Sequence, residues 1–337
     1  MTTKTTIVGN PLRRSRPRVG KCAAVAAILI TLTVATGCSG SSSPTAKTAP
    51  STQTSSPAAT QKPASQTVDP SASKIPLFLT ADLSGAHEVQ VAGKPRVGDP
   101  NGHATAKVEI QNNKITFSFQ WSGISAPTMG HIHEGADGVN GPVRVPFFTT
   151  AMPTTATAAT GSVTISDSTI ANGIRSNPAG YYVNLHTAEF PGGAVRGQLV
   201  PAGHPLDMLN GVSLSWKHAF LAGSQEVHVA GKPPVGDPHG HAAAFVRLGA
   251  SSIDYSFVWV GVTPTLGHIH QGKAGVNGSV VVPLFMTPVP SGVFALSGTV
   301  GNVDPGLIEK IRKRPTDFYA NLHTAKFPGG AVRGQLF

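Results

Sequence analysis

Cysteine is scarce in this sequence. The 337 residues contain two, Cys22 and Cys38, and both lie near the N-terminus, outside any segment that we expect to form a folded core. A disulfide framework and a cysteine-based metal site are therefore excluded for the folded part of the chain. Charged residues are also few, at 12%, whereas 38 glycines and 28 prolines favour many turns over long helices.

Acidic residues are absent from the start of the chain, and this explains most of the formal net charge of +10. The first 37 residues hold six of the 26 Lys and Arg residues and none of the 16 acidic residues. The remainder has 20 basic and 16 acidic residues, a net charge of +4. The basic balance is therefore mostly a targeting feature, and we exclude nucleic acid as a partner.

No apolar run in the N-terminal region is long enough to suggest a membrane span. Cys22–Thr36 has 15 residues, which is typical of a signal-peptide core, and it follows the basic run Arg13–Lys21. It leads to Gly37-Cys38, which resembles the lipobox of bacterial lipoproteins, although Ala35 stands where Leu is usual. The resemblance implies acylation of Cys38, and hence an exported protein anchored by lipid to the extracytoplasmic side of the cell membrane. A plain signal peptide with an incidental Cys38 is the alternative.

Composition changes along the chain and divides it into segments. Residues 39–74 are mostly Ser, Thr, Pro, Ala and Gln, a composition that cannot bury enough apolar surface to fold. A chain of 337 residues is long enough for two domains. We expect a lipoprotein signal peptide at 1–37, a disordered tether at 38–74, domains at 75–202 and 212–337, and a connector at 203–211.

The two expected domains are copies of each other. Asn184–Leu199 returns as Asn321–Leu336 with a single difference, Glu189 against Lys326. Because a charge reversal is tolerated there, we expect this position to face water. Any activity of the first repeat should also be present in the second.

Apolar and polar residues alternate within each repeat. Ile115–Trp121 is the clearest case, and a period of two is typical of a strand with one buried face. Such short segments, separated by turns rich in Gly, Pro and Asn, predict an all-β fold of two tandem antiparallel β-sandwich domains, immunoglobulin-like or superoxide-dismutase-like. Other expected strands are 104–110, 143–148, 161–165, 181–185 and 195–200, with one short helix per repeat at 168–176 and 305–313.

Three motifs follow one another in the same order in both repeats. In the first they are Glu88-Val89, then Gly-His-Ile-His from Gly130, then Tyr-Val-Asn-Leu-His-Thr from Tyr182, which leads to Gly-Gly-Ala-Val-Arg-Gly-Gln-Leu. Together they resemble the CHRD domain, which was named for its repeats in chordin and also occurs in bacterial secreted proteins. The resemblance covers residues 79–199 and 220–336, with Ala320 in place of Val183 as a mild departure. It implies a β-sandwich-like fold and little about chemistry.

The histidines give the clearest candidate site. His131 and His133 should project from the same face of a strand, because residues i and i+2 share a face. With His186 they would supply three imidazole nitrogens, a donor set that suits zinc or copper. The corresponding residues of the second repeat are His268, His270 and His323. Copper-zinc superoxide dismutase also carries His-x-His on a β-sandwich strand, and this likeness is one of analogy only.

Some residues expected of a metal site do not repeat. Glu134 becomes Gln271, so no carboxylate ligand is shared, and Met129 becomes Leu266, so no axial methionine is shared. A structural role is the alternative. Histidines beside turns can hydrogen-bond to buried carbonyls or side chains, and they then carry no activity.

Two further repeated residues predict a structural ion pair in each repeat. Glu88 is the natural partner of Arg196, and Glu226 is the natural partner of Arg333. A satisfied buried pair of this kind would help to fix the register of the sheet.

Catalytic patterns are lacking, and we expect no enzymatic activity. The sequence has no Gly-x-Ser-x-Gly elbow and no repeated Ser, His and Asp set. The leading hypothesis is a non-catalytic envelope lipoprotein that binds an envelope or extracellular protein or matrix component. The second hypothesis is a copper- or zinc-binding protein that uses the histidines. A dismutase-like redox activity ranks third.

Overall fold

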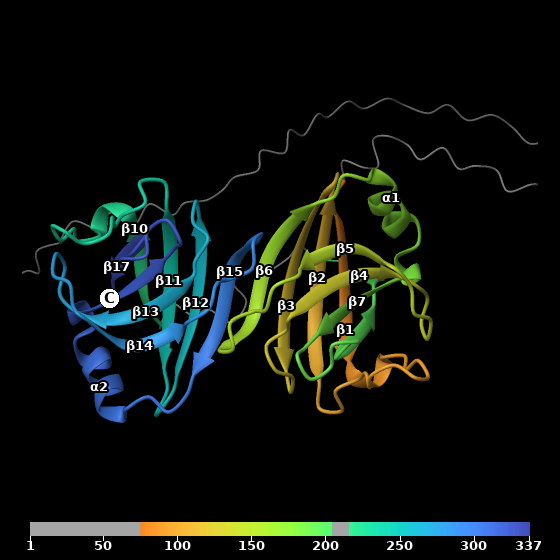
Figure 1. Cartoon of the computed structure of the whole chain (residues 1–337), viewed down its shortest axis with the longest axis horizontal. Helices are drawn as coiled ribbons and strands as arrows, with labels where there is room; N and C mark the ends of the chain where they lie inside the picture. The colour runs from red at the N-terminus through yellow and green to blue at the C-terminus, as the bar shows by residue number, and fades with distance from the viewer. Residues whose placement is uncertain (1–74, 204–215) are drawn as a thin grey trace, which may run out of the picture. The chain divides into compact units, whose positions relative to one another are not determined.

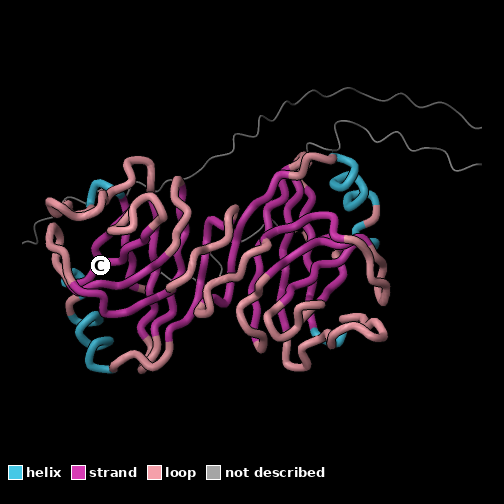
Figure 2. The backbone as a smooth tube through the Cα atoms, in the orientation of Figure 1, coloured by secondary structure: helices cyan, strands magenta, loops and turns pink. Residues whose placement is uncertain are grey.

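The computed structural model describes residues 75–203 and 216–337. The predicted signal peptide, the lipidation site Cys38, the tether and most of the connector lie outside these residues. Strands make up 45% of the described residues and helices 12%, which confirms the all-β class (Figure 2). The described helices include none that is long and apolar enough to cross a membrane.

The first repeat contains nine strands and one α-helix (Figure 1). In chain order they are β1 (Leu77–Ser84), β2 (His103–Gln111), β3 (Lys114–Ser122), β4 (Met129–Glu134), β5 (Val143–Phe148), β6 (Ala156–Thr164), α1 (Ser168–Ser176), β7 (Tyr181–His186), β8 (Val195–Gln198) and β9 (Val200–Pro201). Short 3-10 turns occupy Gly85–His87 and Pro178–Gly180.

The strands of this repeat form a sandwich of two antiparallel halves. One half has the order β6-β3-β2-β1 and the other β5-β4-β7-β8. The halves are joined where β1 pairs with β8, at Ser84 and Arg196. Their inner faces meet at aromatic side chains, since the ring centroids of Phe117 on β3 and Phe147 on β5 are 4.8 Å apart. Every second residue of β3 is buried, as the sequence alternation predicted.

The second repeat is built in the same way. Its elements are β10 (Lys217–Ala222), β11 (His241–Leu248), β12 (Ile253–Val260), β13 (Leu266–Gln271), β14 (Ser279–Phe285), β15 (Val293–Val300), α2 (Pro305–Lys313), β16 (Phe318–His323) and β17 (Val332–Gln335), with 3-10 turns at Gly223–Gln225 and Pro315–Asp317. Its halves have the orders β15-β12-β11-β10 and β14-β13-β16-β17.

Both helices have the predicted bounds because their ends are marked by local chemistry. The side chain of Asp167 accepts a hydrogen bond from the backbone N–H of Thr169 at the start of α1, and Asp304 caps α2 in the same way. Pro178 follows α1 by two residues, and proline cannot continue a helix. The bounds of β6 differ from the prediction: it begins at Ala156 rather than at residue 161, because small residues there hid the strand pattern.

Candidate metal centre

Strand β4 places two histidines on one face. Ile132 is fully buried and points to the opposite side from His131 and His133, as the period of two predicts. Strand β7 pairs with β4 and brings His186 beside them. The three rings form one cluster, which we call the three-histidine cluster of the first repeat, and one nitrogen from each lies within 4.8 Å of the others.

The closest contact in this cluster joins two ring nitrogens. Nδ1 of His131 lies 3.2 Å from Nε2 of His186. Two nitrogens bound to one zinc ion at about 2.0–2.1 Å, at the tetrahedral angle, stand roughly 3.3 Å apart. The pair therefore already has the spacing of two ligands of a tetrahedral ion.

Backbone carbonyls determine which nitrogen of two rings carries hydrogen. Nδ1 of His133 lies 2.9 Å from the carbonyl oxygen of Gly141, and Nδ1 of His186 lies 2.9 Å from that of Pro191. A carbonyl only accepts, so both Nδ1 atoms carry hydrogen, and in a neutral ring Nε2 then presents a lone pair. Metal-binding histidines in proteins show this arrangement, in which the second nitrogen donates to a fixed acceptor.

One nitrogen in each cluster has no partner. Nε2 of His133 is buried and makes no hydrogen bond, and the same holds for Nε2 of His270 in the second repeat. A buried polar atom without a partner is costly, by about 1–3 kcal/mol. The same atom is left unpaired in both repeats, so the feature follows from the sequence that the two copies share.

Burial keeps the rings neutral. The pKa of His131 is lowered to about 4, chiefly by burial and to a smaller extent by the neighbouring rings of His186 and His133. Burial also lowers the pKa of His133 and of His186, against the opposing effect of their carbonyl hydrogen bonds. Neutral imidazole is the form that binds a metal ion, so protons do not compete with the ion at neutral pH.

The second repeat reproduces this geometry independently. Nδ1 of His268 lies 3.1 Å from Nε2 of His323, and Nδ1 of His270 lies 3.0 Å from the carbonyl oxygen of Gly278. Nδ1 of His323 lies 2.9 Å from the carbonyl oxygen of Pro328. Burial lowers the pKa of His268 to about 4, as it does for His131. The structure thus brings together all six predicted histidines, three in each repeat.

A stack of side chains positions His133. Its ring lies 4.8 Å from the ring of Tyr182, at an interplanar angle of 11°. The guanidinium carbon of Arg196 lies 3.5 Å from the centre of the same tyrosine ring. The hydroxyl of Tyr182 also accepts a hydrogen bond from the backbone N–H of Gly141, the residue whose carbonyl holds His133. Arg196 and Tyr182 therefore fix both the ring and its carbonyl partner.

The predicted direct ion pair between Glu88 and Arg196 is corrected by the structure. Arg196 instead donates to the side-chain oxygen of Asn140 and to the carbonyl oxygens of Ala136 and Val139. The loop after β4 presents several acceptors at once, which suit the five N–H groups of a guanidinium. Arg333 makes the same contacts to the loop after β13, with Asn277 in place of Asn140, so the predicted pair with Glu226 is corrected in the same way.

Glu88 has a different partner. Both of its oxygens accept from the side-chain amide of Asn184, at 2.9 and 3.1 Å, and the carboxylate packs where a Cβ on Gly193 would collide with it. Burial raises its pKa to about 7, although the charge of Arg196 opposes this shift. Glu226 accepts from Asn321, and its pKa is also raised to about 7 by burial.

The carboxylate adjacent to the cluster in sequence is engaged elsewhere. Glu134 accepts a hydrogen bond of 2.6 Å from Arg144 and is exposed. Among the described residues, the groups that could hold an ion consist of histidines alone.

Sequence reasoning missed five contributing residues, two in each repeat and a fifth in the second repeat alone. Tyr182 and Tyr319 repeat, and so do Asn140 and Asn277 in the Gly-Val-Asn-Gly turn, but repetition alone does not show that they support a histidine. Met286 was missed because it has no counterpart in the first repeat, although its sulfur lies 3.3 Å from Nε2 of His268.

Comparison with known proteins gives one match. A model of the CHRD domain matches residues 79–199 and 218–336, which together form most of the chain. No curated protein and no solved structure matched. The matched regions span the residues of both three-histidine clusters, and the chain belongs to the CHRD domain family.

Proposed function

We propose that the protein is a cell-envelope lipoprotein in which each CHRD repeat binds one zinc or copper ion at its three-histidine cluster. The buried Nε2 of His133, unpaired in the first repeat as is Nε2 of His270 in the second, carries this proposal. An ion bound to that nitrogen would take the place of the missing hydrogen-bond partner.

The donor atoms of the first repeat follow from the hydrogen bonds. Nε2 of His133 and Nε2 of His186 present lone pairs, because their Nδ1 atoms donate to carbonyls. His131 completes the set through Nδ1, 3.2 Å from Nε2 of His186. To bind there, His131 shifts its hydrogen from Nδ1 to Nε2, which leaves the ring neutral.

A purely structural cluster would look different. Most buried polar side-chain atoms in native proteins have a hydrogen-bond partner, because each unpaired one reduces stability. Here the carbonyl bonds and the tyrosine stack leave a nitrogen of His133 without a partner instead. This favours a binding site over a structural network.

The proposal describes binding without turnover. Glu134, the acidic residue closest in sequence to the cluster, is paired with Arg144, so it does not serve as a general base at the cluster. Anchoring at Cys38 would hold both repeats at the outer face of the membrane, where an envelope or extracellular protein or matrix component could be a further partner.

Metal titration of the full chain tests the proposal. Cys22→Ser and Cys38→Ser are included in every sample, because free thiols also bind zinc and copper. We expect close to two ions per chain, and none in His133→Ala/His270→Ala. The matched control is His103→Ala/His241→Ala, which removes a repeated but exposed pair outside the clusters and should leave both ions bound.

The result that would reject the proposal is equally specific. If the chain takes up no zinc or copper, and His133→Ala/His270→Ala alters only the free energy of unfolding, then the histidines are structural. The search for function would then turn to envelope partners.

A further inference from the structure

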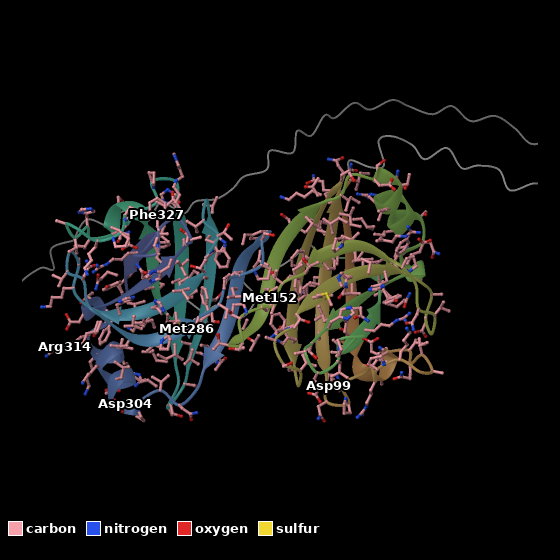
Figure 3. All side chains as sticks on the ribbon, viewed as in Figure 1. Asp99, Met152, Met286, Asp304, Arg314 and Phe327 are labelled. Carbon is pink, nitrogen blue, oxygen red and sulfur yellow. The ribbon has the colours of Figure 1, made fainter. Side chains whose placement is uncertain are left out.

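One difference between the surroundings of the two clusters lies directly after strands β5 and β14. Gly130 pairs with Phe148, and Gly267 pairs with Phe285, so the residues that follow, Thr149 and Met286, are equivalent. Met286 follows β14 directly and is labelled in Figure 3. A thioether is therefore present beside the cluster of the second repeat, where the first repeat has a hydroxyl.

The sulfur of Met286 faces a specific nitrogen. Sδ lies 3.3 Å from Nε2 of His268, the ring nitrogen that points away from His323. If both atoms bound one ion at about 2.1 and 2.3 Å, this separation would give an angle of roughly 100° at the ion. The two atoms are thus spaced as a pair of ligands.

The hydrogen bonds around His268 determine that its Nε2 carries the lone pair. Its Nδ1 lies 3.1 Å from Nε2 of His323, whose own Nδ1 donates to the carbonyl oxygen of Pro328. Nε2 of His323 therefore accepts, and Nδ1 of His268 carries the hydrogen between the two rings. In a neutral ring this leaves the lone pair of His268 on Nε2, toward the sulfur. A ligand histidine whose other nitrogen donates to a fixed acceptor is the usual arrangement around a metal.

The two residues differ in their exposure to solvent. Met286 is 57% exposed, whereas His268 is only 6% exposed. An ion arriving from solvent would meet the flexible thioether first and the fixed imidazole next.

We propose that Met286 Sδ and His268 Nε2 form an outer Cu(I) site that the first repeat lacks. Thioether sulfur is a soft ligand that selects Cu(I), whereas Zn(II) is well served by the three imidazoles. A neutral imidazole has one lone pair, so His268 serves either the outer site or the three-histidine cluster at a given moment. This inference rests on the proposed function only in treating the cluster region as a metal site.

The test compares Cu(I) and Zn(II) binding in the full chain with Cys22→Ser and Cys38→Ser. Cu(I) affinity is measured without oxygen by competition with a Cu(I)-specific chelator, and X-ray absorption reports whether sulfur is bound to copper. We expect a sulfur ligand in the parent chain. Met286→Thr, which copies the first repeat, should remove it and weaken the tightest Cu(I) site by at least about tenfold, with Zn(II) uptake unchanged.

Two further variants sharpen the test. Thr149→Met should create a second copper–sulfur site beside His131. His270→Ala should remove a Zn(II) ion from the second repeat and leave the copper–sulfur signal in place, because His270 belongs only to the cluster.

Failure of the inference and failure of the proposed function give different results. Normal Zn(II) binding, with Cu(I) affinity and X-ray absorption unaffected by Met286→Thr, would reject the outer site and leave the proposed function standing. Absence of Zn(II) binding together with a copper–sulfur signal that Met286→Thr abolishes would reject the cluster as a site and support the outer pair.

Discussion

Two kinds of buried ionisable residue in each repeat have pKa shifts of opposite direction. The pKa values of the cluster histidines are lowered, and the pKa of Glu88 is raised to about 7. Both shifts arise mainly from burial, which disfavours the charged form of any side chain. Between pH 4.5 and 7 the folded state therefore holds a proton on Glu88 that the unfolded state has lost. Stability from this proton is fully present below pH 4.5 and is lost as pH rises through 7.

Replacing the two glutamates isolates this effect. In Glu88→Gln/Glu226→Gln the side chains stay neutral at every pH and can still accept from Asn184 and Asn321. We expect the free energy of unfolding of the variant, relative to wild type, to increase as pH rises from 4.5 to 8. Denaturant unfolding with a chelator present measures it, and the histidine contribution cancels because both proteins share it. A constant difference across this range would show that the glutamates are ionised throughout in the fold.

The single residues show what the sequence could predict. His131 and His133 follow from the i, i+2 rule, and His186 was found because its segment repeats. The partners of Arg196 could not be predicted from repeated side chains such as Glu88, since they include the backbone carbonyls of Ala136 and Val139. Every residue has a backbone carbonyl, so the sequence does not show which carbonyls accept a hydrogen bond from an arginine. Met286 could not be predicted from repetition, because Thr149 occupies the corresponding position of the first repeat.

At the scale of elements, one loop connects the buried arginine to the site. Residues 135–142, between β4 and β5, are held by Arg196 through Asn140, Ala136 and Val139, and they present the Gly141 carbonyl to His133. The sequence predicted the strand that follows the loop, Val143–Phe148, with the bounds that the structure shows. It could not predict this loop, whose conformation depends on an arginine far along the chain.

The tyrosine in this arrangement gives a prediction about affinity. Tyr182→Leu removes the ring that stacks on His133 and the hydroxyl that accepts from Gly141. We expect Zn(II) affinity of the first repeat to fall by about 10- to 100-fold, the usual effect of losing a group that orients a ligand. Calorimetric titration in a His270→Ala background, where only the first site remains, measures it.

Tyr182→Phe is the matched control, because it keeps the stack and loses only the hydroxyl. Its effect should be smaller than that of Tyr182→Leu. Equal affinities in the parent and in Tyr182→Leu, with both folded by circular dichroism, would mean that the stack does not position the histidine.

At the scale of the whole molecule, the duplication predicts independent sites. Each three-histidine cluster is built from the strands of its own repeat and shares no residue with the other. We expect about two Zn(II) ions in the parent, about one in His133→Ala or His270→Ala, and none in the double variant. Mass spectrometry under native conditions counts the ions directly. Loss of both ions in a single variant would instead indicate one site shared by the repeats.

The last prediction concerns where the two sites act. Gly37-Cys38 follows a basic run and an apolar run of signal-peptide length, so the proposed anchor is a lipid on Cys38. In the native host, the wild type should fractionate with membranes and incorporate a labelled fatty acid. Cys38→Ala should lose the label and leave the membrane fraction, whereas Cys22→Ala, which changes the other cysteine, should keep both. Because acyl chains bind membranes by burial of CH₂ groups, each worth about 0.8 kcal/mol, losing them should release the protein rather than weaken its attachment slightly. Membrane association of Cys38→Ala at the wild-type level would disprove the lipoprotein assignment, and the metal sites would then need another route to the cell surface.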